Sequence, residues 1–321
     1  MNFIKKTVCV FLYYALSLVF VACQGDDTSG ESKPKLIVCT WGDSLTAGAG
    51  GDGTTYPNVL QSLFGVDFQV INCGVGGEGS LTIAARQGGI PMQLARSVEL
   101  PADNSAVIIG DRDHSFVSSW NGRPVGPLLQ GGEASVNYCV IDEIECTLRW
   151  TGSAWDDAAG RYTLQRVIAG HAPVTLHEKS IVFTSSMRQY RSQFANVFFI
   201  GQNGSYATNA DLVAQYNAVI DFSLCQKFVI LGLTSGTAAE RADLETLMTE
   251  EFGAHYINLR EYLATSGLQD ADMIPTQADT EAMSEGKVPP SLLSDHVHFN
   301  AKGYESIGKL IYKRFRYLGI I

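Results

Sequence analysis

Short apolar runs alternate with amphipathic stretches near both ends of the chain. Apolar runs bounded by Gly, Asn or Ser indicate buried strands, whereas apolar positions that recur every three or four residues indicate helices. The predicted strands are 36–40, 68–72, 197–201, 227–234 and 255–258, and the predicted helices are 56–63, 210–222, 238–252 and 301–317. Because strands that alternate with helices favour a parallel sheet covered on both faces, the pattern predicts an α/β domain.

The pattern changes between residues 89 and 186, where Val, Thr, Tyr and Gly are frequent. The runs 136–140, 145–150 and 161–168 are typical of antiparallel strands. We therefore predict a small antiparallel β domain, 89–186, inserted into an α/β domain made of 35–88 and 187–321. Aromatic residues of the insertion are candidates for a sugar-binding platform, with packing in its core as their more ordinary role: Trp120, Tyr138, Trp150, Trp155 and Tyr162.

The beginning of the chain has the pattern of an export signal followed by a tether. Two lysines precede an uncharged apolar stretch, 8–22, which is shorter than the ~20 residues of a membrane-spanning helix. Cys23 follows the small residue Ala22, so residues 1–23 resemble a bacterial lipoprotein signal in which Cys23 is lipidated. An ordinary signal peptide, cleaved without lipidation, is the alternative. Residues 24–34 are polar and rich in Gly, Ser and Asp, which indicates a flexible tether.

Composition narrows the possible partners. The net charge of the chain is −10, which argues against nucleic-acid binding. The cysteines show none of the C-x-x-C spacings of zinc sites, so no metal is expected. Cys39 with Cys73, and Cys139 with Cys146, are candidate disulfides, and burial as small apolar side chains is the open alternative.

The candidate nucleophile is Ser44, in the segment Gly42-Asp43-Ser44-Leu45-Thr46 directly after the first predicted strand. This places it at the carboxyl edge of the sheet, where open α/β sheets bind ligands. A serine needs a general base, an acid that orients the base, and donors for the oxyanion. His298 and Asp295 meet the first two needs, because their spacing lets the carboxylate accept the Nδ1 proton and leaves Nε2 for the serine. His296 is the competing histidine, and we expect it to face solvent.

Two further segments are candidates for oxyanion donors. The glycine-rich stretch 72–79 follows the second strand and lets the backbone approach a ligand closely. It also satisfies the dinucleotide pattern G-x-G-x-x-G, but its helix is cut short at Gly88-Gly89 and no second strand ending in an acid follows, so we disfavour that interpretation. Asn203, after the third strand, has a side-chain N–H able to reach an oxyanion near Ser44, with a turn residue as its ordinary role.

Four ordered segments together resemble the sequence blocks of the SGNH (GDSL-type) hydrolase superfamily. They are Gly42-Asp43-Ser44-Leu45, Gly77 in its glycine-rich turn, Gly201-x-Asn203 and Asp295-x-x-His298. The resemblance covers 36–86 and 197–319 and implies a flavodoxin-like three-layer α/β/α sandwich with a parallel sheet. It further implies Ser44 as nucleophile, His298 as base, Asp295 as its orienting acid, and an oxyanion hole made of Ser44 N–H, Gly77 N–H and the Asn203 side chain.

The expected activity is ester hydrolysis through an acyl-enzyme, without a metal or other cofactor. We expect an extracytoplasmic carbohydrate O-acetylesterase, anchored by its lipid on the periplasmic or cell-surface side of a membrane and acting on a small-molecule or glycan ester. A lipid or aryl esterase, including a lysophospholipase-like hydrolase, is the alternative substrate class. A surface lipoprotein that binds glycans without turnover is the alternative of another class, and the presence of all four segments argues against it.

Overall fold

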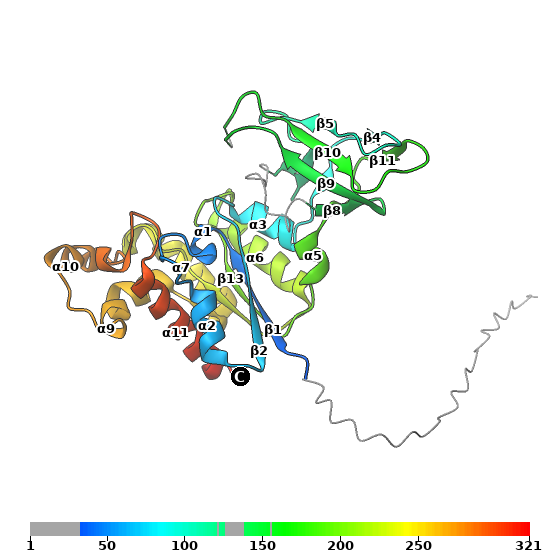
Figure 1. The fold of residues 1–321 in the computed structure, drawn as a ribbon. Helices are drawn as coiled ribbons and strands as arrows, with labels where there is room; N and C mark the ends of the chain where they lie inside the picture. The colour runs from blue at the N-terminus through cyan, green and yellow to red at the C-terminus, as the bar shows by residue number, and fades with distance from the viewer. Residues whose placement is uncertain (1–32, 121, 126–137, 155) are drawn as a thin grey trace, which may run out of the picture. The chain divides into compact units, whose positions relative to one another are not determined.

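The structure of the chain is a computed structural model that describes residues 33–120, 122–125, 138–154 and 156–321. The predicted signal with Cys23, nearly all of the predicted tether, and Trp155 lie outside the described residues. Residues 35–321 form one compact unit, shown in Figure 1. Within the part of the chain that is described, no helix is long and apolar enough to cross a membrane.

A five-stranded parallel sheet lies in the first and last parts of this unit. Its strands are β1 (Leu36–Gly42), β2 (Phe68–Gly74), β13 (Ala195–Phe199), β14 (Phe228–Leu231) and β15 (Tyr256–Ile257), in the order β15-β14-β13-β1-β2. All five predicted strands are confirmed, with ends shifted by a few residues. Gly42 pairs with Phe199 on one side and with Gly74 on the other, so β1, β2 and β13 end at the same edge.

Helices cover both faces of this sheet. Since side chains alternate along a strand, Val38 packs in one hydrophobic cluster and its neighbour Cys39 in the other. The first cluster includes α2 (Tyr56–Phe64) and α11 (Ala301–Tyr317), and the second includes α3 (Ser80–Gln87), α6 (Asn209–Ser223) and α7 (Ala238–Phe252). The predicted α/β class with a parallel sheet is confirmed. Figure 1 shows α2 and α11 side by side.

Shorter helical segments connect these elements. They are α1 (Ser44–Ala47), α5 (Ser185–Gln189), η1 (Gly253–His255), α8 (Leu259–Tyr262), η2 (Leu263–Gly267), α9 (Leu268–Asp270), α10 (Gln277–Ser284) and η3 (Pro290–Leu292). The periodicity of the sequence did not reveal most of them, because each is too short to show a full amphipathic repeat.

Antiparallel sheets occupy the region between α3 and α5. The largest has the order β12-β8-β9-β10-β5, while β11 pairs with β4, and β6 lies between β3 and β7. The strands are β3 (Gln93–Leu94), β4 (Val98–Leu100), β5 (Val107–Gly110), β6 (Val117–Ser119), β7 (Arg123–Pro124), β8 (Tyr138–Ile141), β9 (Ile144–Trp150), β10 (Tyr162–Arg166), β11 (Val174–Leu176) and β12 (Phe183–Thr184). The three predicted antiparallel strands are confirmed for the part of them that the structure describes.

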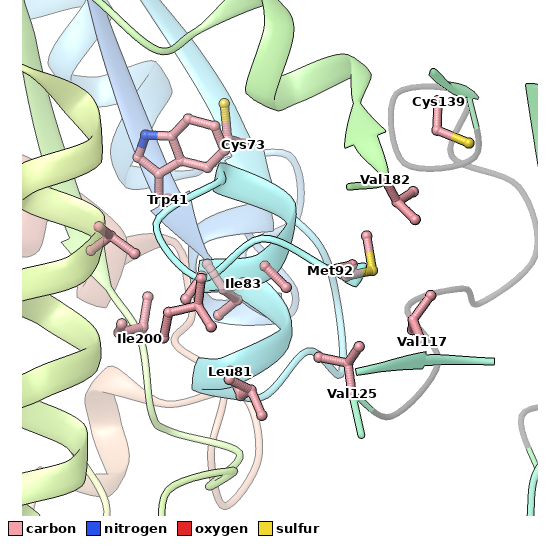
Figure 2. Close-up of a cluster of buried hydrophobic side chains, with 14 of the residues drawn as sticks. Trp41, Cys73, Leu81, Ile83, Met92, Val117, Val125, Cys139, Val182 and Ile200 are labelled. Carbon is pink, nitrogen blue, oxygen red and sulfur yellow. The ribbon is translucent and has the colours of Figure 1, made fainter. Parts of the chain in front are cut away.

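One hydrophobic cluster joins the antiparallel strands to the parallel sheet. In Figure 2, Trp41 of β1 and Ile83 of α3 belong to the same cluster as Met92, Val117 and Val182. Described residues of 89–186 therefore belong to the same hydrophobic cluster as α3 and the face of the sheet that α3 covers. That this region is a domain of its own stays a prediction.

The aromatic residues of the insertion divide into two groups. Trp150 and Tyr162 are 8% and 2% exposed, and their ring centroids lie 4.7 Å apart, so these two residues form core rather than a sugar platform. Tyr138 is 46% exposed, and Trp120 is half-buried. Of the four candidate residues that the structure describes, Tyr138 and Trp120 therefore stay candidates for a platform.

The candidate disulfides are present as free thiols. Cys39, Cys73, Cys139 and Cys146 are all buried and unbonded. Cys139 and Cys146 lie opposite each other in the β8–β9 pair. The structure thus agrees with the alternative in which these residues are small buried side chains.

Candidate active site

Ser44 lies where β1 ends and α1 begins. A Cβ atom on Gly42 would lie 2.8 Å from the carbonyl oxygen of Phe199, so only glycine allows β1 and β13 to approach this closely here. Asp43 caps α1 by accepting the N–H of Leu45 at 2.9 Å. Ser44 is the first residue of α1, and its N–H therefore has no partner within that helix. The hydroxyl and the amide of Ser44 are both at the carboxyl edge of the sheet.

His298 and Asp295 complete a hydrogen-bonded array with Ser44, across 254 residues of sequence. The Nε2 atom of His298 lies 3.0 Å from the Ser44 Oγ atom, and its Nδ1 atom lies 2.8 Å from Asp295 Oδ2. The other carboxylate oxygen of Asp295 accepts the backbone N–H groups of Val297 and His298, each at 2.7 Å. Loop geometry thus fixes the carboxylate, and the carboxylate fixes the imidazole.

The charge of Asp295 determines which nitrogen of His298 holds the proton. The His298 backbone N–H, the His298 side chain and the Val297 N–H lower the pKa of Asp295 well below its usual range. Because an ionised carboxylate only accepts hydrogen bonds, Nδ1 of His298 donates to it, and the lone pair of Nε2 faces the Ser44 hydroxyl. His296 is exposed and lies outside this array, in agreement with its expected orientation.

The predicted donor segments border Ser44. Val75 N–H donates to the Gly42 carbonyl at 3.1 Å, which holds the turn after β2 against the end of β1. A Cβ atom on Gly76 would stand 3.8 Å from the Cβ atom of Ser44. The next residue, Gly77, has a φ of 81°, a conformation that favours glycine. The structure thus brings the glycine-rich turn beside the candidate nucleophile, while the oxyanion role of Gly77 stays a prediction.

Asn203 is held by two acceptors. Its Nδ2 atom donates to the carbonyl oxygen of Glu78 at 3.1 Å and to Asp43 Oδ2 at 3.3 Å. Since the amide nitrogen has only two hydrogens, donation to an oxyanion requires that it release one of these bonds. The bond to Asp43 is the longer one and is therefore the one that we expect an oxyanion to replace.

Asp43 is a buried carboxyl group at the centre of this arrangement. It is 1% exposed, and burial, together with the nearby charge of Glu78, raises its pKa to about 6 despite the opposing effects of the Leu45 N–H and His298. Asp43 lies in the segment that holds Ser44, but its residue type and position there did not predict a role for it. Its contact with Asn203 joins residues 160 positions apart, so no local pattern could have indicated it.

The insertion is bonded to the segment that follows Asn203. Asp211, in the first turn of α6, accepts the indole N–H of Trp120 at 2.7 Å and the Arg123 guanidinium at 2.9 Å. The same carboxylate accepts the N–H of Ala207 at 2.7 Å. One side chain therefore ties the β6–β7 hairpin to the loop between β13 and α6. This link was not predicted, because Trp120 and Asp211 are 91 positions apart and Trp120 was expected either in a sugar platform or in the core of the insertion.

The surroundings of the glycine-rich turn do not favour a dinucleotide site. The helix after it, α3, ends at Gln87, and the next strand, β3, is a two-residue strand paired antiparallel with β6. The βαβ unit that the dinucleotide pattern requires is thus not formed at this turn. Among the described residues, no group of three or more His, Cys, Asp and Glu side chains is arranged to hold a metal ion.

A scan against models of known protein families finds no match to this chain. A search of curated proteins likewise finds no similar sequence.

Proposed function

We propose that this chain is a serine ester hydrolase of the SGNH type that acts through an acyl-enzyme. The observation that carries the proposal is the continuous array from Ser44 through His298 to Asp295, with bonds of 3.0 and 2.8 Å. A hydroxyl in contact with an imidazole nitrogen, whose other nitrogen is oriented by a carboxylate, is the arrangement that activates a serine.

The proposed reaction uses the residues of this array in turn. His298 Nε2 removes the proton of Ser44 as the Oγ atom attacks the ester carbonyl, and Asp295 stabilises the imidazolium that forms. The N–H groups of Ser44 and Gly77 and the Asn203 amide stabilise the oxyanion. His298 then protonates the departing alcohol, and a water molecule deprotonated by His298 hydrolyses the acyl-enzyme. No step in this scheme calls for a metal or a cofactor.

The strand order supports a flavodoxin-like three-layer arrangement as part of this proposal. Numbered along the chain, the parallel strands have the order 2-1-3-4-5, which is one of the two common doubly wound orders. The order reverses between β1 and β13, and ligands of such sheets bind outside the carboxyl ends of the strands at this point. Ser44 follows β1, and Asn203 follows β13.

The experiment that tests this proposal is ester hydrolysis by the purified chain without its predicted signal. We expect cleavage of p-nitrophenyl acetate, and we expect Ser44→Ala to lower kcat by at least about a thousandfold. Ser62→Ala, at an exposed serine on α2, is the matched control and should retain full activity. If Ser44→Ala hydrolyses the ester as fast as the parent chain, the assignment is wrong.

We propose carbohydrate O-acetyl esters as the substrate class. An exported enzyme would meet acetylated glycans outside the cell, and exposed Tyr138 and half-buried Trp120 are aromatic surfaces on which a sugar can stack. Profiling acetyl against longer acyl esters, and then acetylated oligosaccharides, tests this class. Exclusive cleavage of long acyl chains would favour a lipid esterase, and glycan binding without turnover would favour a binding lipoprotein.

We also propose that Cys23 carries a lipid that anchors the protein outside the cytoplasm. The support is the sequence pattern of residues 1–23. Metabolic labelling with a fatty acid should mark the parent protein and leave Cys23→Ala unlabelled. Equal labelling of the two would contradict the proposal.

A further inference from the structure

A buried ion pair lies beneath the glycine-rich turn. The guanidinium of Arg86, on α3, donates from Nε and Nη2 to the Glu78 carboxylate at distances of 2.8 to 3.1 Å. The two side chains are 1% and 3% exposed. We propose that Glu78 and Arg86 are positioning residues that hold the two loop donors of the oxyanion hole, Gly77 and Asn203; this inference rests on the proposed hydrolase function.

Arg86 bonds to both ends of the turn. Its Nη2 atom donates to the carbonyl oxygen of Cys73, in the last part of β2, at 2.8 Å, and to Glu78 at 2.8 Å. The segment between these partners contains Gly77. A planar guanidinium with several fixed donors therefore sets the distance between the two ends of the turn, and with it the direction of the Gly77 N–H.

Glu78 connects the turn to Asn203. Its side chain bonds to Arg86, while its backbone carbonyl accepts the Asn203 amide at 3.1 Å. A shift of Glu78 therefore moves the acceptor that orients Asn203. Ser80, two residues later, adds a parallel link, because its N–H and its hydroxyl both donate to the Gly204 carbonyl at 2.9 Å.

The charges of Glu78 and Arg86 are costly to bury. Replacing a buried ion pair by packed apolar side chains often leaves a protein equally stable or more stable, so stability alone is a weak reason for this pair. Glu78 and Arg86 bond to the turn that holds Gly77, whereas a second ion pair bonds to neither donor loop. That pair joins Arg260 on α8 to Glu245 on α7, and their side chains are 4% and 14% exposed. This second pair offers a matched comparison within the same chain.

The experiment compares Glu78→Gln and Arg86→Lys with Glu245→Gln in the complete chain. The readouts are kcat and KM for p-nitrophenyl acetate and the rate at which a fluorophosphonate probe modifies Ser44. We expect each of the first two variants to lower kcat and the labelling rate about 10- to 100-fold with KM changed less than about threefold, as for a weakened oxyanion donor. Glu245→Gln should change all three quantities less than about threefold, because it leaves the donor loops intact.

The possible outcomes separate the two proposals. If Glu78→Gln or Arg86→Lys folds normally by near-ultraviolet circular dichroism and keeps the parent rates, the positioning role is refuted while the hydrolase function stands. If Glu78→Gln does not fold, Arg86→Lys, which keeps the positive charge, decides by the same criterion. If Glu245→Gln loses as much kcat as the other variants, the effect is a general loss of stability and the positioning role is wrong. If the parent chain is neither active nor labelled at Ser44, the hydrolase function fails, and the positioning role fails with it.

Discussion

The substitution Asp43→Asn should change how stability depends on pH. Burial raises the pKa of Asp43 to about 6 in the folded protein, whereas an unfolded aspartate titrates near ~3.9. Between about pH 4 and pH 6, the folded protein therefore holds one more proton at this site than the unfolded chain. The unfolding free energy of the parent protein consequently falls as pH rises through this window. A shift of about two pKa units corresponds to about 3 kcal/mol.

An asparagine at position 43 cannot titrate, so the unfolding free energy of the variant does not fall for this reason as pH rises. We expect the stability of the parent chain relative to Asp43→Asn to fall by about 3 kcal/mol between about pH 4 and pH 7. Any steric or hydrogen-bond penalty of the new amide, such as its contact with Asn203, is the same at every pH and leaves the slope unchanged. Urea unfolding at a series of pH values, with free energies from linear extrapolation, measures the difference.

Asp279→Asn is the matched control for this measurement. Asp279 is also fully buried, but bonds from the N–H groups of Ser291 and Thr276 and from their hydroxyls outweigh the effect of burial and lower its pKa. With a lowered pKa, the contribution of Asp279 to the free energy of unfolding is lost only as pH falls below the pKa of an unfolded aspartate, ~3.9. The control should therefore show a constant difference between about pH 5 and pH 7. A constant difference for Asp43→Asn over the same range would refute the reasoning about Asp43.

Three further substitutions test other parts of the site. Gly77→Ala should destabilise the protein by about 1–2 kcal/mol, because a φ of 81° is unfavourable for a residue with a side chain. It should also lower kcat while changing KM less, and an unchanged kcat would argue against an oxyanion role for this residue. Asp295→Asn should lower kcat by at least about a hundredfold through loss of the correct imidazole tautomer, and retention of more than half the parent activity would contradict the triad. Trp120→Phe should lower the free energy of unfolding by about 1–3 kcal/mol, because the indole N–H bonds to a charged carboxylate, and thermal or urea unfolding that matches the parent would contradict the link between the insertion and α6.

The parallel sheet and the Ser44 array were accessible from sequence because their signals are local. Each strand is a short apolar run with polar or glycine residues at its ends, and β13 is buried throughout, as expected of a central parallel strand. Asp295 and His298 are three residues apart, so their mutual contact follows from loop geometry. The meeting of His298 with Ser44 was predicted from the chemistry that a serine requires and from the order of the four segments.

The hydrogen bonds around the proposed oxyanion donors could not be predicted from the sequence in the same way. Asp43 with Asn203, and Trp120 with Asp211, join residues 160 and 91 positions apart, and periodicity carries no information about such pairs. Glu78 and Arg86 are only eight residues apart, but a charged pair on a turn and a short helix is ordinarily exposed to solvent. The burial of this pair becomes visible only in the folded structure, where the Arg86 guanidinium lies 5.7 Å from the ring centroid of Trp41 on β1.

Some residues of the candidate site are positioned by local geometry, and others by hydrogen bonds between distant parts of the chain. Ser44 at the start of α1 and the loop with Asp295 and His298 each have a geometry set within a few residues. The proposed oxyanion donors depend instead on a network that links the ends of β1, β2 and β13. Asp43 belongs to both, because it caps α1 immediately before Ser44 and also accepts the Asn203 amide. When an oxyanion replaces Asp43 as the acceptor, one negative group substitutes for another at the same donor. On the proposed function, Asn203 is thus oriented toward a negative charge before the reaction begins, which would lower the reorganisation that the transition state requires.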